Sequence, residues 1–211
     1  MVKNIILTGF LFSTFAFFAF TDYKSVKSYN SNFSAIEKRK IALDTPIKLS
    51  DKEKITKIRE LYQSVEANTQ SYRIEKKEYR NPDPELYYDM SLYDAYYNDS
   101  ELKKLVEMLG EEGYYLEIAY YFNEGNVFFI HAAYSYMDNL YKETRIYLYE
   151  NKIISALTKV KSEDDETTVL SSLKNANDTE FVKDKAQFEK EWLGRIKAAP
   201  ERFSKGTLVQ E

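Results

Sequence analysis

The chain has 211 residues, of which 44% are hydrophobic and 16% aromatic, enough for one domain with a core and a small appendage. Its 30 basic and 34 acidic residues are interspersed and leave a formal net charge of −4, so a nucleic acid is not an expected partner. The sequence has no cysteine and one histidine, His131, which excludes disulfides, thiolate catalysis and His-rich metal sites.

The first residues have the pattern of a secretory signal peptide. Lys3 precedes an uncharged run at residues 5–20 that is rich in Phe, Leu and Ile, and Asp22 ends it. At about 1.5 Å a residue this run falls short of the ~30 Å hydrocarbon core, which disfavours a spanning helix. We therefore predict export to the periplasm or the extracellular space, without stable membrane insertion after signal cleavage. A retained anchor and a buried core helix are the alternatives.

A polar, aperiodic leader precedes the first helical pattern, which lies near residues 51–70. Ser50 and Glu53 form an S-x-x-E capping pattern. Apolar residues follow at spacings of three and four: Ile55, Ile58, Leu61, Tyr62 and Val65. This stripe predicts an amphipathic helix lying on its own sheet, and a helix that binds a partner is the alternative.

Alternating and Tyr-rich segments after the helix predict strands. Within residues 72–79, Tyr72, Ile74 and their neighbours alternate with charged residues. The sequence Asn-Pro-Asp-Pro at 81–84 breaks this pattern, and residues 86–97 are expected to be extended. Residues 102–109 fit a strand or a helix equally well.

Two hairpins are predicted next. Residues 114–122 and 127–137 flank a turn with Gly125, and 144–149 and 153–158 flank a second turn. Both faces of 127–137 are largely apolar, which predicts a central strand covered on both sides.

The composition changes after residue 160. Residues 161–168 are acidic and expected to be exposed, and two short helical patterns follow. One contains Val169, Leu170 and Leu173; the other contains Phe181, Phe188, Trp192 and Ile196. Pro200 is expected to end the second helix and the last ten residues to be frayed.

Together these patterns predict an α+β fold, with an N-terminal amphipathic helix on an antiparallel β-meander of five to seven strands and with C-terminal helices. The expected segments are a signal peptide at 1–20, a flexible leader at 21–49, the helix and meander at 50–160, and an acidic loop, C-terminal helices and tail at 161–211.

A combination of motifs runs from about residue 50 to residue 160. It consists of Ile55, Ile58 and Tyr62 in the capped helix, Ser71 and Tyr72 at a strand start, Glu117, Tyr120, Tyr121, Phe122, Gly125, Phe129 and Ile130 in the first hairpin, and Tyr147, Tyr149, Asn151 and Ile154 in the second. This combination resembles a group of small exported bacterial proteins of unknown function. The resemblance implies a Gram-negative cell envelope and a helix-plus-meander fold, and it implies no activity. The second turn departs from the group's Asn-Gly, because Lys152 follows Asn151.

Few residues invite a catalytic interpretation. His131 is expected in mid-strand among apolar residues, with Ser135 ~13 Å further along the same face. Glu117 and Glu124 could form an acid pair, but 34 acidic residues make chance pairs expected. The acidic run 163–166 lacks the alternating pattern of a calcium loop. We predict no catalytic residue, no metal ligand and no cofactor.

The tyrosine content is the most distinctive feature, with 19 tyrosines in the chain. Tyrosine is enriched at interfaces, and it also fits a half-buried sheet. The residues proposed as a binding surface are Tyr115, Tyr121, Tyr134, Tyr136, Tyr147 and Tyr149. We predict a non-catalytic exported binding protein for an unknown protein, peptide or glycan. A carboxylate-dependent hydrolase and an inhibitor or immunity-type protein are the alternatives.

Overall fold

The computed structural model describes residues 49–80, 90–111 and 113–209. The predicted signal peptide, all but the last residue of the leader, and the expected break at 81–84 lie outside the described residues. Residues 49–209 belong to one compact unit, so the C-terminal helices are part of the same body as the sheet.

The described residues form one antiparallel sheet of nine strands in the order β8-β7-β6-β5-β4-β3-β2-β1-β9. The strands are β1 (Arg73–Arg80), β2 (Met90–Asn98), β3 (Glu101–Glu111), β4 (Tyr114–Asn123), β5 (Asn126–Tyr136), β6 (Asn139–Tyr149), β7 (Lys152–Val160), β8 (Ala176–Asn177) and β9 (Thr207–Leu208). The α+β architecture is confirmed, but the expected count of five to seven strands is wrong. The two-residue strands β8 and β9 extend the sheet edges and are too short to show a period in the sequence.

Tight turns set the register of the central hairpins. Glu124 and Gly125 both have positive φ between β4 and β5, and Glu150 and Asn151 do so between β6 and β7. Two successive residues with positive φ match the right-handed twist of the strands that they join. In the second hairpin the left-handed positions fall on Glu150 and Asn151, so Lys152 is free to begin β7.

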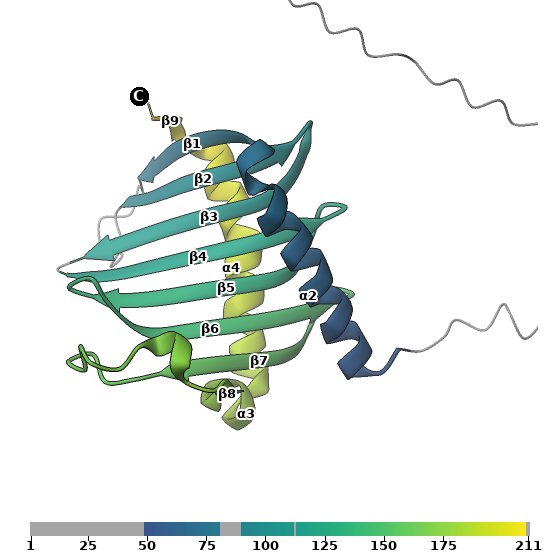
Figure 1. Cartoon of the computed structure of the whole chain (residues 1–211). Helices are drawn as coiled ribbons and strands as arrows, with labels where there is room; N and C mark the ends of the chain where they lie inside the picture. The colour runs from purple at the N-terminus through teal and green to yellow at the C-terminus, as the bar shows by residue number, and fades with distance from the viewer. Residues whose placement is uncertain (1–48, 81–89, 112, 210–211) are drawn as a thin grey trace, which may run out of the picture. The chain divides into compact units, whose positions relative to one another are not determined.

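Helix α2 (Asp51–Asn68) crosses one face of the sheet, and helix α4 (Lys185–Lys205) crosses the other (Figure 1). The capping box at Ser50 and Glu53 is confirmed, with the Ser50 backbone N–H donating to Glu53 Oε2 at 2.8 Å. The helix buries Ile58 and Val65 against the sheet. Leu61 departs from the predicted apolar stripe, because 39% of it is exposed.

Helix α4 continues five residues beyond Pro200, which corrects the expected end of the helix at that residue. Ala199 and Phe203 are buried on the sheet on either side of the proline, and this burial offsets the backbone hydrogen bond that proline removes. The predicted helical run is also divided, because the short helix α3 (Thr179–Lys183) holds Phe181. Residues 170–172 form one 3₁₀ turn, and the expected fraying of the tail is wrong as far as Val209.

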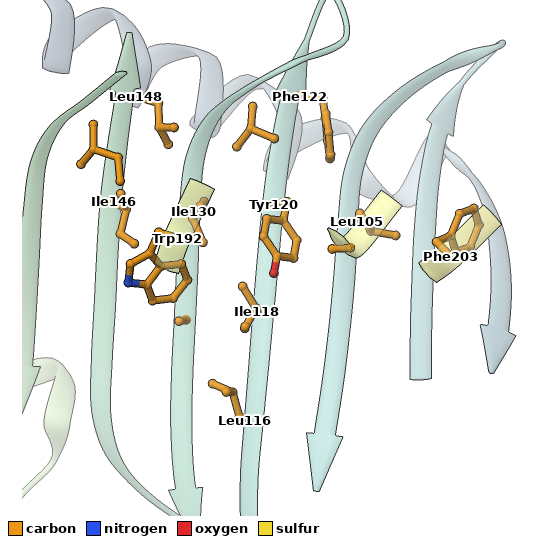
Figure 2. Close-up of a cluster of buried hydrophobic side chains, with 14 of the residues drawn as sticks. Leu105, Leu116, Ile118, Tyr120, Phe122, Ile130, Ile146, Leu148, Trp192 and Phe203 are labelled. Atoms are coloured by element: carbon orange, nitrogen blue, oxygen red, sulfur yellow. The ribbon is translucent and has the colours of Figure 1, made fainter. Parts of the chain in front are cut away.

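The core between α4 and the sheet contains a buried polar cluster. Figure 2 shows Trp192 and Phe203 of α4 among apolar side chains of β3 to β6. Within this core, Glu107 is 1% exposed. Its carboxylate accepts hydrogen bonds from the hydroxyls of Tyr93 at 2.6 Å and Tyr120 at 2.9 Å, and from Arg202 of α4 at 3.3 Å. A buried carboxylate is stable only with such partners, so the cluster fixes α4 on this face.

In the described part of the chain, no helix is both long enough and apolar enough to cross a membrane.

Two glycines of the C-terminal region test the packing of β9 on β1. A Cβ on Gly206 would lie 2.9 Å from the Glu78 carbonyl oxygen, whereas a Cβ on Gly194 would meet nothing within 4 Å. We expect Gly206→Ala to lower the free energy of unfolding by about 1–3 kcal/mol through overpacking. Gly194→Ala, in an exposed position of α4, should raise it by about 0.5–1 kcal/mol through helix propensity. Urea unfolding measures both, and equal effects of one sign would contradict the packing described for β9.

Candidate functional site

Helix α2 covers only one half of its face of the sheet. In Figure 1 it lies over the strand ends at the right, and no labelled helix crosses the left half of that face. The half that no helix of the described residues covers carries six side chains that alternate with residues of the α4 core, and we call them the open face: Met90, Leu92, Asp94, Met108, Tyr115 and Glu117. Met90 and Leu92 are each 37% exposed and Tyr115 is 43% exposed.

Tyr115 packs beside Gly110, which lies opposite it on β3. The two residues are cross-strand partners, and the Tyr115 ring is 3.5 Å from where a Cβ of Gly110 would stand. Burial raises the pKa of the Tyr115 phenol, and the carboxylates of Glu117 and Asp94 raise it further. Burial also raises the pKa of Tyr96, and the same two carboxylates raise it further. The open face therefore combines apolar surface with two carboxylates, of which Asp94 lies opposite Lys76 of β1.

A pocket of about 200 Å³ lies where α2 meets β5 and β6. We call it the α2 pocket, and its lining consists of Arg59, Tyr62, Gln63, Phe129, His131, Arg145 and Tyr147. Its aromatic rings pack on one another, with the Phe129 centroid 5.0 Å from that of Tyr62 and 5.2 Å from that of Tyr147. The Arg59 guanidinium lies over the Tyr147 ring at 5.6 Å. The pocket thus has aromatic walls and two arginines.

Its charged groups come from facing positions of β5 and β6. His131 is the cross-strand partner of Arg145, and Glu143 lies next to both on the same face. Glu143 is 3.4 Å from Arg145 Nη2 and 3.8 Å from His131 Nε2. Burial lowers the pKa of His131, while the nearby Glu143 opposes this shift and Arg145 adds to it. His131 is therefore a mostly neutral imidazole at neutral pH.

A second ionic group holds α2 in place above the sheet. Glu66 near the end of α2 accepts hydrogen bonds from Lys104 of β3 at 2.8 Å and from the Tyr121 hydroxyl of β4 at 3.0 Å. Burial, followed by the charge of Glu66, raises the pKa of Tyr121 and keeps it a donor. These bonds fix the wall of the α2 pocket that the helix provides.

The six tyrosines predicted as a binding surface do not lie on one surface. Tyr121 and Tyr147 are only 3% and 2% exposed beneath α2, so neither presents its ring on the outer surface of the sheet. Tyr134 packs against the α4 core, where burial raises its pKa to about 12. The structure brings Tyr121 and Tyr147 together at Phe129, and it separates both from Tyr134.

Of the other three tyrosines, Tyr115 is exposed, and Tyr136 and Tyr149 are half-buried. Tyr115 is on the open face, and Tyr149 lies below the Lys54 ammonium of α2 at 5.1 Å. Tyr136 packs on Tyr114 with their ring centroids 4.6 Å apart. Of the six predicted residues, Tyr115 therefore contributes to the open face and Tyr147 to the α2 pocket.

The acidic groups considered for catalysis or metal binding have other surroundings. Glu117 belongs to the open face, whereas Glu124 is in the β4–β5 turn. Hydrogen bonds from the side chain and backbone of Thr168, and from those of Thr167, lower the pKa of Asp165 and order the loop. Over residues 49–80, 90–111 and 113–209 no group of three His, Asp or Glu side chains is placed to hold a metal ion.

Sequence patterns missed Arg59, Gln63 and Arg145. Arg59 and Gln63 are four residues apart on α2 and flank Tyr62, so they share one side of the helix. That spacing was a usable signal, but the partner strand positions of His131 and Arg145 depend on the register of β5 and β6. The arginine pair becomes visible only when the helix is placed on the sheet.

A larger hollow of about 490 Å³ lies at the β1–β9 edge, lined by residues that include Glu78, Arg80 and Leu208. Its lining includes Arg80 and Val209, each the last residue of its described range, whereas the residues on both sides of every α2-pocket residue are described.

Comparison with known proteins finds no relative: no family model matches the chain, and no curated protein or solved structure is significantly similar to it.

The pKa of His131 offers a direct test of the α2 pocket, because the chain has one histidine and hence one imidazole titration in an NMR spectrum. We expect a pKa below the usual 6.5, lower still in Glu143→Gln and higher in Arg145→Gln. Since the folded value is the lower one, stability is unaffected above about pH 6.5 and is lost as the pH falls toward the folded pKa. Identical pKa values in all three proteins would contradict the described geometry.

Proposed function

We propose that this protein is an exported, non-catalytic binding protein that holds a peptide segment of a partner on the open face. The observation that carries the proposal is the half-covered sheet face. Helix α4 closes its own face over the central strands, whereas α2 leaves exposed Met90, Leu92 and Tyr115 beside a formed pocket. Exposed apolar side chains that cluster in this way are typical of interaction sites.

The charge of the open face indicates the chemistry of the partner. Asp94 and Glu117 lie close enough to the phenols of Tyr96 and Tyr115 to raise the pKa of both. Apolar and aromatic surface edged by carboxylates is complementary to a segment that carries apolar and basic side chains. We therefore propose such a peptide segment in preference to a glycan.

The polar groups beside the open face also support recognition without catalysis. Glu66 is engaged by Lys104 and Tyr121, and Glu143 by Arg145. Such pairs hold side chains in fixed positions, which suits binding by shape and charge. The export component of the proposal rests on the charge and hydropathy pattern of residues 1–20.

Site-specific photocrosslinking in bacterial cells tests the proposal. A photoreactive residue is placed at Leu92 on the open face or at Leu193 on α4, in the full chain; these positions are 37% and 38% exposed. We expect one discrete adduct from Leu92 in the envelope or medium fraction, and none from Leu193. The adducted partner is identified by mass spectrometry, and a synthetic peptide of its crosslinked segment should bind the purified protein.

Tyr115→Lys provides the matched loss-of-binding variant. It removes an exposed ring and adds a cation that repels a basic segment, so it should abolish the Leu92 adduct without lowering the unfolding midpoint. Identical adducts from Leu92 and Leu193, or no adduct from Leu92, would rule out the open face as the binding surface. Retention of the protein in the cytoplasm would rule out export.

A further inference from the structure

We propose that the α2 pocket binds the C-terminal carboxylate of the peptide, together with an aromatic or branched apolar side chain of its last residue. The inference rests on the proposed function, because the pocket adjoins the open face. His131 lies two residues from Ala133, which is the cross-strand partner of Glu117 on the open face. A chain that ends in the pocket would therefore continue over the open face.

The arginines of the pocket have N–H donors that are not engaged by the described residues. A guanidinium offers five N–H donors. Arg145 makes one ion pair, to Glu143 at 3.4 Å, and Arg59 has no carboxylate partner among the described residues, only the face of Tyr147. Arg145 also lies near Tyr62, since its charge lowers the pKa of that phenol against the larger effect of burial. The two guanidinium groups thus flank one small volume from α2 and from β6.

A carboxylate is the anion that this setting fits best. Guanidinium groups bind planar carboxylates through paired N–H···O bonds, and an aromatic wall lowers the local dielectric around them. Phe129, Tyr62 and Tyr147 provide that wall and also a surface on which a ring or a branched side chain can stack. A volume of about 200 Å³ accommodates one terminal residue.

Charge complementarity places the rest of the peptide. The pocket presents Arg59 and also Arg145, which is paired with Glu143, whereas the adjoining open face presents Glu117, and Asp94 opposite Lys76 of β1. A peptide with a terminal carboxylate and a basic residue upstream meets the Arg59 guanidinium at one place and the Glu117 carboxylate at the other. The two charged regions therefore specify the direction of the bound chain.

Isothermal titration of the purified chain with three probes tests the inference. The probes are acetyl-Lys-Ala-Phe with a free carboxylate, the same tripeptide as the C-terminal amide, and acetyl-Phe with a free carboxylate. We expect the free-acid tripeptide to bind at least roughly tenfold more tightly than the amide, since the amide loses a charge-assisted hydrogen-bond pair. It should also bind more tightly than acetyl-Phe, which cannot reach the open face.

Arginine variants assign the effect to the pocket. Arg59→Gln and Arg145→Gln should each weaken the binding of the free-acid tripeptide by roughly tenfold and leave the affinity for the amide unchanged. Arg145→Lys should recover part of the lost affinity. Arg195→Gln is the matched control, because Arg195 lies over Trp192 on the α4 side of the sheet. Circular dichroism melting checks that each variant is folded.

Each result decides one part of the inference. Equal affinity for the free acid and the amide, or no saturable binding of the free acid at concentrations on the order of 10 mM, overturns the carboxylate site. Equal affinity for acetyl-Phe and the tripeptide overturns the peptide direction. A discrete Leu92 adduct together with either result leaves the open face as the binding surface, so failure of the pocket and failure of the proposed function are distinguishable.

Discussion

The buried carboxylate of Glu107 is the constraint on which the rest of the structure depends. An ionised carboxylate in an apolar core is tolerated only when donors surround it, and here the donors come from β2, β4 and α4. Burial, together with the charge of Glu107, raises the pKa of Tyr93 and of Tyr120, so both phenols stay protonated and donate. Arg202 completes the set from the part of α4 beyond Pro200, where Phe203 is also buried on the sheet.

The two faces of the sheet differ in how far their helices cover them. The α4 face is closed by Phe188, Trp192 and Phe203 over the central strands. The α2 face is held by Glu66 at one place and is otherwise half covered, so its pocket and open face stay accessible. A rigid sheet fixed from behind is a suitable support for a binding surface in front, because little ordering is needed when a ligand arrives.

Local sequence patterns predicted the helices and strands. The extent of α4 and the burial of individual side chains depend on long-range contacts that those patterns do not show. The S-x-x-E cap, the stripe of α2 apart from Leu61, and the β4–β5 hairpin are local features, and the structure confirms them. The continuation of α4 past Pro200 places Phe203 on the sheet and Arg202 beside Glu107, 95 positions earlier in the chain, and no periodicity reveals these contacts. Tyrosine content predicted an aromatic sheet, but the burial of Tyr121 and Tyr147 follows from where α2 lies. The pairing of Arg59 with Arg145 in the α2 pocket also follows from where α2 lies on the sheet.

Urea unfolding of three Tyr→Phe variants tests the role of Glu107 most directly. Tyr93, Tyr120 and Tyr147 are all at most 2% exposed, but only the first two donate to Glu107, and Tyr147 makes no hydrogen bond to the described residues. We expect Tyr93→Phe and Tyr120→Phe each to lower the free energy of unfolding by about 1.5–3 kcal/mol, as for hydrogen bonds to a charged group, and Tyr147→Phe to leave it within about 0.5 kcal/mol. Equal losses in all three would contradict the account, because they would show that the Glu107 cluster is not what fixes α4 on the sheet.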